Sequence, residues 1–496
     1  MSELVEKKEE RKISSFESLV DEYLNYNNES KQYEKELEVR FGTKGKIIKR
    51  DDFENVIKKI TSCGFVCKDL KGKHIMRIMN EYDKNEVTIS NIRTEIENIE
   101  NIQNFCKFNR PPDNNFIKYQ KKFNIKKDDV KILPHMNNDY NFKLSFQIED
   151  NIHRQSPIIQ SQLLEKWEQI PKSYRHMNRL EFMNQDKANP IKYHLSIVKS
   201  SVKNKTGQYV YEKNIRNVDI FNQKENYEIE IELDNNVLKT YPQTKEDLIA
   251  LLKKNIKYVL CGLQNTNYPV SYKQLNGIAR EYLSLLKIDK NVDDVKSKDF
   301  IGPSSITLQI SNIIDDSNVS LENIRSNYSV TEKADGERRL LYICKKGNIY
   351  LIDTNMNIHF TGIKTNKKNI FSTILDGELI MQDKYKKFIN LFAAFDVYFI
   401  NSVDRRELHF NYKEELKDIQ NKPDKPKEGR LKLLEKVVKL LNADIMSREI
   451  KINFQITSKE FYYENNIFEN CNKIITKSNE GLFTYNTDGL IFTPVN

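Results

Sequence analysis

The sequence lacks long hydrophobic runs and has few cysteines. No apolar stretch among its 496 residues approaches the roughly 20 residues that a membrane-spanning helix needs. The charged start of the chain has no apolar segment typical of a secretory signal peptide. The six cysteines are scattered, and only Cys63 and Cys67 are close, which excludes a disulfide-stapled scaffold and disfavours a zinc ribbon. We therefore expect a cytoplasmic protein with reduced thiols and no membrane partner.

The composition is that of a folded protein with a mild positive charge. Lys and Arg number 80 against 71 Asp and Glu, which gives a net charge of +9. Hydrophobic residues make up 38% and aromatic residues 10%, enough to exclude a mostly disordered chain. The length suggests two to four domains. The charge is compatible with a polyanionic partner but does not identify one.

The residue pattern changes along the chain. Residues 1–28 are typical of a charged tail and a short helix, and residues 29–240 contain short alternating strands of an antiparallel β domain. Residues 241–300 form a helical connection, and residues 301–496 mix strands with a clear helix. The sequence predicts an α+β protein. The clearest predicted strands are Glu36–Phe41, Lys143–Ile148, Tyr174–Phe182, Ile191–Val198 and Tyr227–Leu233.

Two predicted strands carry charged residues at every second position. These residues are Glu36, Glu38 and Arg40 in one strand, and Glu228, Glu230 and Glu232 in the other. Alternate residues of a strand share a face. Carboxylates in a row repel each other, and a hard cation with oxygen ligands relieves the repulsion. An ordinary solvated sheet face would show the same alternation, so the row alone leaves a metal site and a surface both open.

Other predicted strands carry basic residues in the same alternation. These residues are Arg93, Lys118, Lys143, Arg175, Arg179 and Lys192. Each alone is typical of an exposed salt bridge. Inside a closed barrel, however, such positions would line a tunnel. Glutamates holding a divalent ion beside cations that bind phosphate oxygens are what hydrolysis of a terminal phosphate requires.

The acidic strands resemble those of a known enzyme family. The segment of residues 36–42 and the strand with Glu228, Glu230 and Glu232 are similar to the paired acidic strands of tunnel-type, metal-dependent RNA 5′-triphosphatases. These enzymes occur in the capping enzymes of fungi and of large DNA viruses. The resemblance implies an eight-stranded triphosphatase tunnel at residues 29–240.

The resemblance also implies roles for the tunnel residues. Metal binding, of Mg²⁺ or Mn²⁺, falls to Glu36, Glu38, Glu228, Glu230 and Glu232. The catalytic residues are Glu36, Glu38, Glu230, Glu232, Glu149 and Arg93. Triphosphate binding falls to Arg40, Arg93, Lys118, Lys143, Arg175, Arg179 and Lys192. Two positions depart from the family: His194 stands where an acidic residue is common, and Met177 where a basic residue can be found.

A lysine motif begins a second constellation in the last region. Lys333-x-Asp335-Gly336 alone is a chance-level match that a β-turn would explain. Three ordered segments strengthen it, at residues 374–379, 395–398 and 487–492. Their order and spacing resemble motifs I, III, IIIa and IV of the covalent nucleotidyltransferases. That family comprises mRNA guanylyltransferases and ATP- or NAD-dependent polynucleotide ligases.

The second resemblance implies an ATP-grasp-like, ligase-type α+β domain at residues 301–496. Lys333 would form the covalent lysyl–nucleotide bond. Nucleotide binding would also involve Asp335, Gly336, Arg338, Asp353, Glu378, Phe395, Asp396 and Asp488. A lysine nucleophile must be neutral, so we expect its pKa to lie well below the usual value of about 10.4, lowered by cations and a bound metal. The segment Ile301–Leu308 resembles the entry to the guanylyltransferase domain of viral capping enzymes, and this resemblance favours GTP over ATP as the substrate.

These features predict a bifunctional mRNA capping enzyme. It would remove the γ-phosphate of 5′-triphosphate RNA and transfer GMP from GTP to the diphosphate end. Two alternatives stay open: a ligase-type nucleotidyltransferase with an accessory polyphosphatase tunnel, and a capping-complex scaffold with only triphosphatase activity.

The end of the chain and its composition add two expectations. The sequence stops at Asn496, before the lysine-rich motif V and OB-fold lid usual in the family. We expect these parts, and any methyltransferase region, in a longer chain or a separate subunit. The richness in Asn, Ile and Lys hints at a large cytoplasmic DNA virus, with a virion or viral factory as the location.

Overall fold

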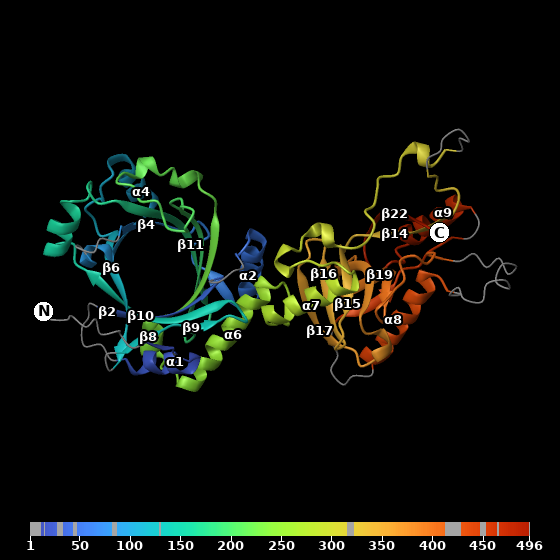
Figure 1. The fold of residues 1–496 in the computed structure, drawn as a ribbon, viewed down its shortest axis with the longest axis horizontal. Coiled ribbons are helices and arrows are strands. Elements are labelled where there is room, and N and C mark those ends of the chain that lie inside the picture. Colours follow the sequence, from blue (N-terminus) through green and yellow to red (C-terminus); the bar gives the residue numbers. More distant parts are fainter. Residues whose placement is uncertain are drawn as a thin grey trace. The chain divides into compact units, whose positions relative to one another are not determined.

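The computed structural model forms two compact units, Met1–Asn265 and Thr266–Asn496 (Figure 1). The described residues are 11–13, 15–26, 33–42, 47–81, 87–127, 130–314, 322–411, 428–446, 453–463 and 466–495. The charged tail expected at the start lies mostly outside them, and the short helix after it is α1 (Phe16–Asn25). None of the described helices is both long and apolar enough to cross a membrane.

Eight antiparallel strands of the N-terminal unit close into a barrel. They are β2 (Tyr33–Phe41), β4 (Lys73–Asn80), β5 (Ile92–Glu97), β6 (Ile117–Asn124), β10 (Phe142–Ile152), β11 (Lys172–Asn184), β12 (Ile191–Ser200) and β13 (Asn226–Leu233). The order around the barrel is β12-β13-β2-β10-β6-β5-β4-β11, and β11 pairs back with β12. Closure removes the exposed sheet edges. The predicted eight-stranded tunnel is therefore confirmed.

Apolar and polar residues alternate along each strand because the outer face of the barrel is apolar and the inner face is polar. Leu37 and Val39 of β2, for example, are fully buried in a core outside the barrel. That core is completed by α1, α2 (Arg50–Ser62) and α6 (Lys245–Leu263). A second outer core packs α4 (Ile99–Phe108) against the barrel on the opposite side (Figure 1). The apolar residues thus face outward, and the polar residues between them face the tunnel.

The helices α2 and α6 pack closely because a glycine lies at their contact. A Cβ atom added to Gly262 of α6 would lie 2.5 Å from the Cα atom of Val56 in α2. Backbone atoms at that distance cannot be avoided by a change of rotamer. Gly262 therefore allows the close approach that buries the outer core.

Smaller elements complete the N-terminal unit. They are β1 (Arg11–Ile13), β3 (Phe65–Cys67), β7 (Lys126–Lys127), β8 (Val130–Leu133), β9 (His135–Asn137), α3 (Val87–Ser90), α5 (Asn235–Thr240), a π-helix at Ile158–Leu164 and 3₁₀ turns at Ile215–Asn217 and Ile220–Asn222. β3 pairs with β11, and β9 pairs with β10. β1, β8 and β7 form a separate three-stranded sheet.

The C-terminal unit is built on a seven-stranded sheet. Its strands are β15 (Glu337–Ile343), β16 (Asn348–Asp353), β17 (Ile358–Lys364), β18 (Thr373–Gln382), β19 (Phe388–Ile400), β20 (Val403–Asp404) and β21 (Gln455–Ser458). The order is β17-β16-β15-β18-β19-β20, and β21 runs parallel beside β19. A two-stranded sheet joins β14 (Tyr328–Ala334) to β22 (Thr487–Pro494).

Helices cover both faces of this sheet. On β15, Leu340 and Tyr342 pack in a core with α7 (Tyr272–Leu285). The alternate residues Leu341 and Ile343 pack in a core with α8 (Arg430–Met446). The helix α9 (Ile467–Asn479) packs on the two-stranded sheet. Short 3₁₀ turns lie at Val292–Asp294, Ser297–Asp299, Ile310–Asn312 and Lys368–Ile370.

The secondary structure agrees with the main sequence predictions. The five predicted strands lie within β2, β10, β11, β12 and β13. The C-terminal unit mixes helices and strands, so the α+β prediction is confirmed. Of the two helices in the region expected to connect the domains, α6 belongs to the first compact unit and α7 to the second.

Gly262→Ala should destabilise the N-terminal unit, because the new methyl group would displace the backbone of α2. We expect the free energy of unfolding to fall by about 1–3 kcal/mol, measured by urea unfolding followed by circular dichroism. Gly277→Ala in α7 is the matched control, since its Cβ atom would meet nothing within 4 Å. The control should be more stable by about 0.5–1 kcal/mol. A Gly262→Ala protein as stable as wild type would contradict the packing described here.

Candidate active sites

The two acidic strands lie side by side in the barrel. Glu38 of β2 is directly opposite Glu232 of β13, and Arg40 is opposite Glu230. Opposite residues in an antiparallel pair project to the same face, which here is the tunnel. The two-residue alternation also places Glu36 and Glu228 on this inner face. The structure thus places all five glutamates predicted to bind metal on the inner face of two neighbouring strands.

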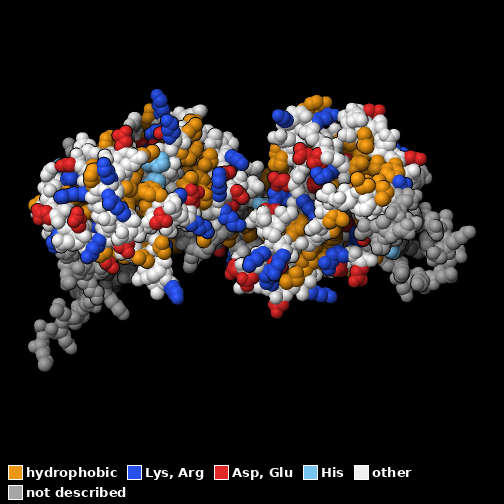
Figure 2. Space-filling model, turned by 90° about the horizontal axis from the view of Figure 1, so that it is seen from above, with side chains coloured by type: hydrophobic (Ala, Val, Ile, Leu, Met, Phe, Trp, Pro, Cys, Tyr) orange, Lys and Arg blue, Asp and Glu red, His pale blue; other side chains and the backbone are white. Residues whose placement is uncertain are grey.

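The other predicted tunnel residues also project inward. Lys143 is opposite Arg40, and Lys192 is opposite Glu232. Continuing around the barrel, the register places Arg93, Lys118, Glu149, Arg175 and Arg179 on the same face. The outer surface, in contrast, mixes charges of both signs among apolar side chains (Figure 2).

Glu230 lies at the centre of one group of ion pairs. Its carboxylate is almost fully buried and pairs with Arg40, while Nη2 of Arg179 lies 3.2 Å from Oε2. Burial favours the protonated form, but Arg179 and Arg40 hold the pKa of Glu230 well below its usual value. Nε of Arg40 also lies 3.1 Å from Oε1 of Glu38. Removing one partner of such a buried pair usually costs about 3–5 kcal/mol.

Glu36 lies in a second group, in which negative charge is in excess. The ammonium group of Lys122 pairs with Glu36 and lies 2.8 Å from Oε1 of Glu149. Burial and the repulsion from Glu149, Glu38 and Glu232 outweigh this cation and raise the pKa of Glu36 to about 7. Glu36 can therefore exchange a proton near neutral pH while it faces three other carboxylates.

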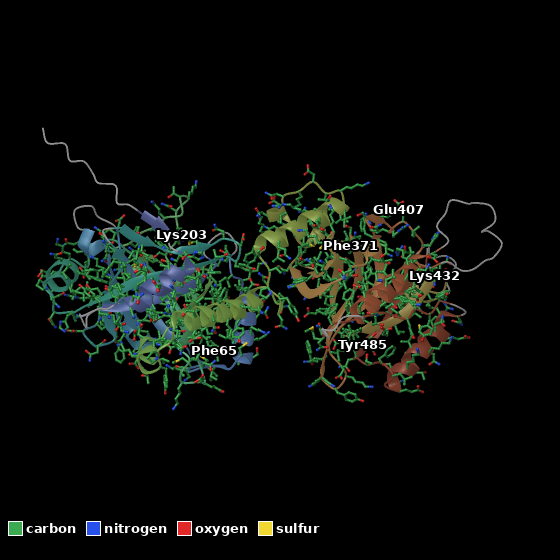
Figure 3. All side chains as sticks on the ribbon, turned by 90° about the horizontal axis from the view of Figure 1, so that it is seen from below. Phe65, Lys203, Phe371, Glu407, Lys432 and Tyr485 are labelled. Carbon is green, nitrogen blue, oxygen red and sulfur yellow. The ribbon has the colours of Figure 1, made fainter. Side chains whose placement is uncertain are left out.

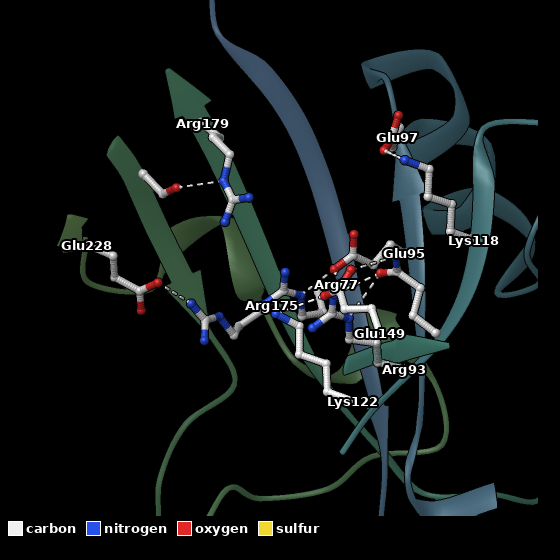
Figure 4. Close-up of polar contacts among 12 residues, drawn as sticks. Arg77, Arg93, Glu95, Glu97, Lys118, Lys122, Glu149, Arg175, Arg179 and Glu228 are labelled. Atoms are coloured by element: carbon white, nitrogen blue, oxygen red, sulfur yellow. Dashed lines mark hydrogen bonds and ion pairs between the residues drawn. The ribbon is translucent and has the colours of Figure 1, made fainter. Parts of the chain in front are cut away.

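Arg93 links the second group to the far wall of the tunnel. Its Nη2 atom lies 2.8 Å from Oε1 of Glu149, and its Nε atom lies 3.1 Å from Oε1 of Glu95. Arg77 binds the same oxygen of Glu95 at 2.6 Å (Figure 4). Although burial opposes ionisation, Arg77 and Arg93 lower the pKa of Glu95 to about 2. Arg93 is therefore held rigidly beside Glu149.

Lys118 lies apart from these groups, towards one end of the tunnel. Its ammonium group is 2.9 Å from Oε1 of Glu97 (Figure 4). Lys73 lies 2.9 Å from the other oxygen of Glu97. The Lys118 side chain is 46% exposed. At the same end, Lys192 pairs with Asp234 at 2.9 Å.

Sequence reasoning missed three central tunnel residues. Glu95 follows the predicted Arg93 by two residues, and Lys122 follows the predicted Lys118 by four, so the strand alternation could have identified both. Arg77 lies between Met76 and Ile78 in a strand that was not predicted. Its role is visible only when the register places it opposite Glu95.

His194 and Met177, the two positions that depart from the family pattern, both face the tunnel. His194 lies 3.1 Å from Glu232 and 3.4 Å from Glu181. Burial opposes its protonation, but these two carboxylates raise its pKa. Met177 packs with Ile75 and Val198, so one wall of the tunnel is apolar.

The inner carboxylates offer suitable donors for a divalent metal. Their oxygens are the ligands that Mg²⁺ and Mn²⁺ prefer, and like charges directly opposite each other, as in Glu38 and Glu232, destabilise a sheet unless a cation compensates them. Across the described part of the chain, however, no three acidic, His or Cys side chains lie close enough together to hold an ion. In this conformation Arg40, Arg179 and Lys122 neutralise the carboxylates instead. The donor set fits a hard cation once these side chains are displaced.

A cavity of about 350 Å³ opens at the other end of the tunnel. Four cations line it, namely Arg77, Arg93, Lys122 and Arg175. Arg175 pairs with Glu228 at 2.5 Å, yet its buried Nε atom has no hydrogen-bond partner among the described residues. Buried donors are rarely left unpaired. The cavity therefore suits an anionic ligand with several oxygen acceptors.

Lys333 lies on the exposed edge of the C-terminal unit. It is in β14, and its ammonium group donates to Oδ2 of Asp488 in β22 at 2.6 Å. This hydrogen bond, together with the charges of Glu378 and Asp335, raises the pKa of Lys333. The expectation of a lowered pKa is thus wrong for this conformation, because the nearest charge is a carboxylate. Lys333 becomes a better nucleophile only when Asp488 releases it.

Arg338 is fixed by a buried carboxylate. Its Nη2 atom lies 2.6 Å from Oδ2 of Asp376, which also accepts a 2.6 Å hydrogen bond from Tyr398. Nη1 donates to the carbonyl of Pro303 at 2.7 Å. Gly302 has φ +126°, and a Cβ atom there would lie 2.4 Å from Nη2 of Arg338. Glycine at this position lets the segment approach the arginine.

Glu378 has a buried partner that sequence reasoning missed. Nζ of Lys459 lies 2.8 Å from Oε2 of Glu378 and 3.8 Å from Glu332. The Lys459 side chain is only 2% exposed. Its ammonium group also lies 5.8 Å from the ring centroid of Phe395. Lys459 thus connects two residues predicted to bind nucleotide, although it lies in none of the motifs.

The remaining predicted nucleotide-binding residues lie in three places. Asp335 and Gly336 form the turn between β14 and β15, close to Lys333. Asp396 is buried in a bidentate pair with Arg430, at 2.9 and 3.1 Å. Asp353 lies 3.0 Å from Arg339, whose side chain is on the opposite face of the sheet from Arg338. The structure therefore does not bring Asp353 to the face that holds Arg338.

Glu36→Gln should change how stability depends on pH. The folded-state pKa of about 7 exceeds the ordinary value of 4.5, so the stability of wild type falls as pH rises from about 4.5 to 7 and stays lower above pH 7. Glutamine is neutral throughout. In EDTA, the variant should match wild type at pH 4 and exceed it by roughly 1–3 kcal/mol at pH 8. Urea unfolding measures this, and a difference that does not change with pH would contradict the shift.

Part of the chain is similar to mRNA capping enzymes. Residues 271–496 match the family described as "mRNA capping enzyme, catalytic domain". A probable mRNA-capping enzyme of Acanthamoeba polyphaga mimivirus is 29% identical over 181 residues, which cover 36% of this chain and 13% of that relative. The aligned region thus spans a small part of the relative's length.

Two solved structures are distantly similar. The mimivirus capping enzyme triphosphatase shares 15% identity, with a TM-score of 0.30, over 49% of this chain and 94% of that chain. The S. pombe Pct1 RNA triphosphatase shares 11% identity, with a TM-score of 0.26, over 50% of this chain and 88% of that chain. The eight-stranded barrel is defined by its own strand pairing. Residues 271–496, which contain Lys333 and all four nucleotidyltransferase motifs, thus match the family of mRNA capping enzyme catalytic domains.

Proposed function

We propose that the chain catalyses two successive steps of mRNA capping. The tunnel removes the γ-phosphate from 5′-triphosphate RNA, and the C-terminal unit transfers GMP from GTP to the resulting diphosphate end. The observation that carries the proposal is the pairing on one chain of a charge-lined tunnel with a region matching the capping-enzyme catalytic domain. Either part alone would allow other functions.

In the tunnel, hydrolysis of the γ-phosphate would depend on positioning the triphosphate and compensating its negative charge. Glu36, Glu38, Glu228, Glu230 and Glu232 would hold Mg²⁺ or Mn²⁺, which neutralises phosphate charge when bound. Triphosphate oxygens would bind to Arg40, Arg93, Lys118, Lys143, Arg175, Arg179 and Lys192, together with Arg77 and Lys122. Glu149, held by Arg93 and Lys122 at 2.8 Å, would orient the attacking water.

In the C-terminal unit, the neutral amine of Lys333 would attack the α-phosphate of GTP. A phosphorus–nitrogen bond forms, the bond to the β-phosphate breaks, pyrophosphate leaves, and the amine proton passes to solvent or to Asp488, 2.6 Å away. The terminal phosphate oxygen of diphosphate RNA then displaces Lys333 and forms the cap linkage. Arg338, Glu378 and Phe395 would hold the nucleotide, with Asp376, Asp396 and Lys459 positioning them.

The partners follow from the two reactions. The substrates are 5′-triphosphate RNA and GTP. The likeness of part of the chain to a mimivirus protein supports the cytoplasm, in particular a viral factory, as the place of action.

Lys333→Ala should abolish transfer of label from α-labelled GTP to the protein. The covalent bond requires this amine, so the labelled band on a denaturing gel should disappear. Lys346→Ala, an exposed lysine in the turn after β15, is the matched control and should label like wild type. Labelling from ATP alone, with sealing of nicked RNA, would support a ligase in place of a guanylyltransferase.

Glu230→Ala should reduce phosphate release from γ-labelled triphosphate RNA by at least about 100-fold, because it removes a proposed metal ligand and the carboxylate that Arg40 and Arg179 share. Transfer of GMP to Lys333 should persist, since Lys333 lies in the other unit. Glu225→Ala, at an exposed position directly before β13, is the control. Retention of phosphate release by Glu230→Ala would refute the assignment of the tunnel as the hydrolytic site.

A further inference from the structure

A rigid hairpin borders the cavity at one end of the tunnel. It spans residues 201–212, directly after β12, and Lys203 pairs with Tyr209 across it. Oδ1 of Asn204 accepts hydrogen bonds from the backbone N–H groups of Thr206 and Gln208, both at 3.0 Å. These bonds fix the turn, so Tyr209 keeps a defined position.

Tyr209 is the aromatic side chain of the hairpin that reaches the cavity. It lines the cavity together with Arg77, Arg93, Arg175 and Lys122. The ammonium group of Lys203 lies 4.9 Å from the centroid of the Tyr209 ring. Lys203 is exposed at the periphery of the N-terminal unit (Figure 3), and Lys205 is exposed as well. The hairpin thus combines an aromatic ring with two solvent-exposed cations.

The two ends of the tunnel differ in their charge balance. At the far end, Lys73 and Lys118 share Glu97, and Lys192 pairs with Asp234. Within the described part of the chain, Lys203 and Lys205 have no carboxylate partner. The positive charges of Lys203 and Lys205 beside the cavity are therefore available to bind a polyanion.

We propose that this hairpin binds the first nucleotides of the RNA and thereby sets the end at which the substrate enters. The inference rests on the proposed triphosphatase function. The 5′ phosphates would occupy the cavity, the first base would stack on Tyr209, and Lys203 and Lys205 would bind the backbone phosphates. Stacking on aromatic rings and pairing of cations with the backbone are the general means of binding single strands.

The test compares an RNA with a ligand that has only its phosphates. Labelled 5′-triphosphate RNA is titrated with the full chain in EDTA and followed by fluorescence anisotropy, and inorganic tripolyphosphate is measured by competition. Tyr209→Ala should weaken RNA binding roughly ten-fold, since stacking contributes about 1–3 kcal/mol per base, and change tripolyphosphate binding less than about two-fold. Tyr209→Phe should bind both like wild type.

Two further variants sharpen the result. The double variant Lys203→Ala, Lys205→Ala should weaken RNA binding and reduce its dependence on salt concentration. Tyr241→Ala, an exposed tyrosine away from the cavity, should change nothing. Unchanged RNA binding by Tyr209→Ala, or an equal loss for both ligands, would overturn the proposal. Phosphate release by the wild-type protein tests the triphosphatase function separately.

Discussion

The N-terminal unit depends on charge compensation between glutamates and cations inside its barrel. Glu230 and Glu95 are buried and Glu36 is largely buried, and each is paired with Arg or Lys from another strand. An isolated buried charge would cost several kcal/mol, so these strands are stable together and not separately. Closure through the β11–β12 pairing brings the complementary residues within reach. The same arrangement makes the tunnel receptive to phosphate, because each cation can exchange a carboxylate for a phosphate oxygen.

The balance of charge differs between sites within the tunnel. Around Glu230 the arginines dominate, and its pKa is lowered despite burial. Around Glu36 the carboxylates dominate, and its pKa is raised. A metal cation would be drawn to the second group, and phosphate oxygens to the arginines. Pairs of titratable groups pushed in opposite directions are typical of catalytic sites.

Much of the tunnel could be predicted because strand alternation is a local signal. Glu228, Glu230 and Glu232 lie on one face of their strand, and this does not depend on how the rest of the chain folds. Arg77 and Lys459 could not be predicted in this way. The first acquires its role from the register between β4 and β5. The second contacts Glu378 and Glu332, which lie 81 and 127 residues away in the sequence. The pKa of Lys333 was predicted in the wrong direction because its pairing with Asp488 depends on the β14–β22 ladder.

The inner carboxylates can bind a metal ion only if the chain's own cations give way to it. Titration of the full chain with Mn²⁺, followed by electron paramagnetic resonance, tests it most directly. The double variant Glu38→Gln, Glu232→Gln should bind fewer Mn²⁺ ions per chain, whereas Asp488→Asn should leave the ion in the tunnel in place. Wild-type Mn²⁺ binding by the double variant would show that these carboxylates do not hold the ion.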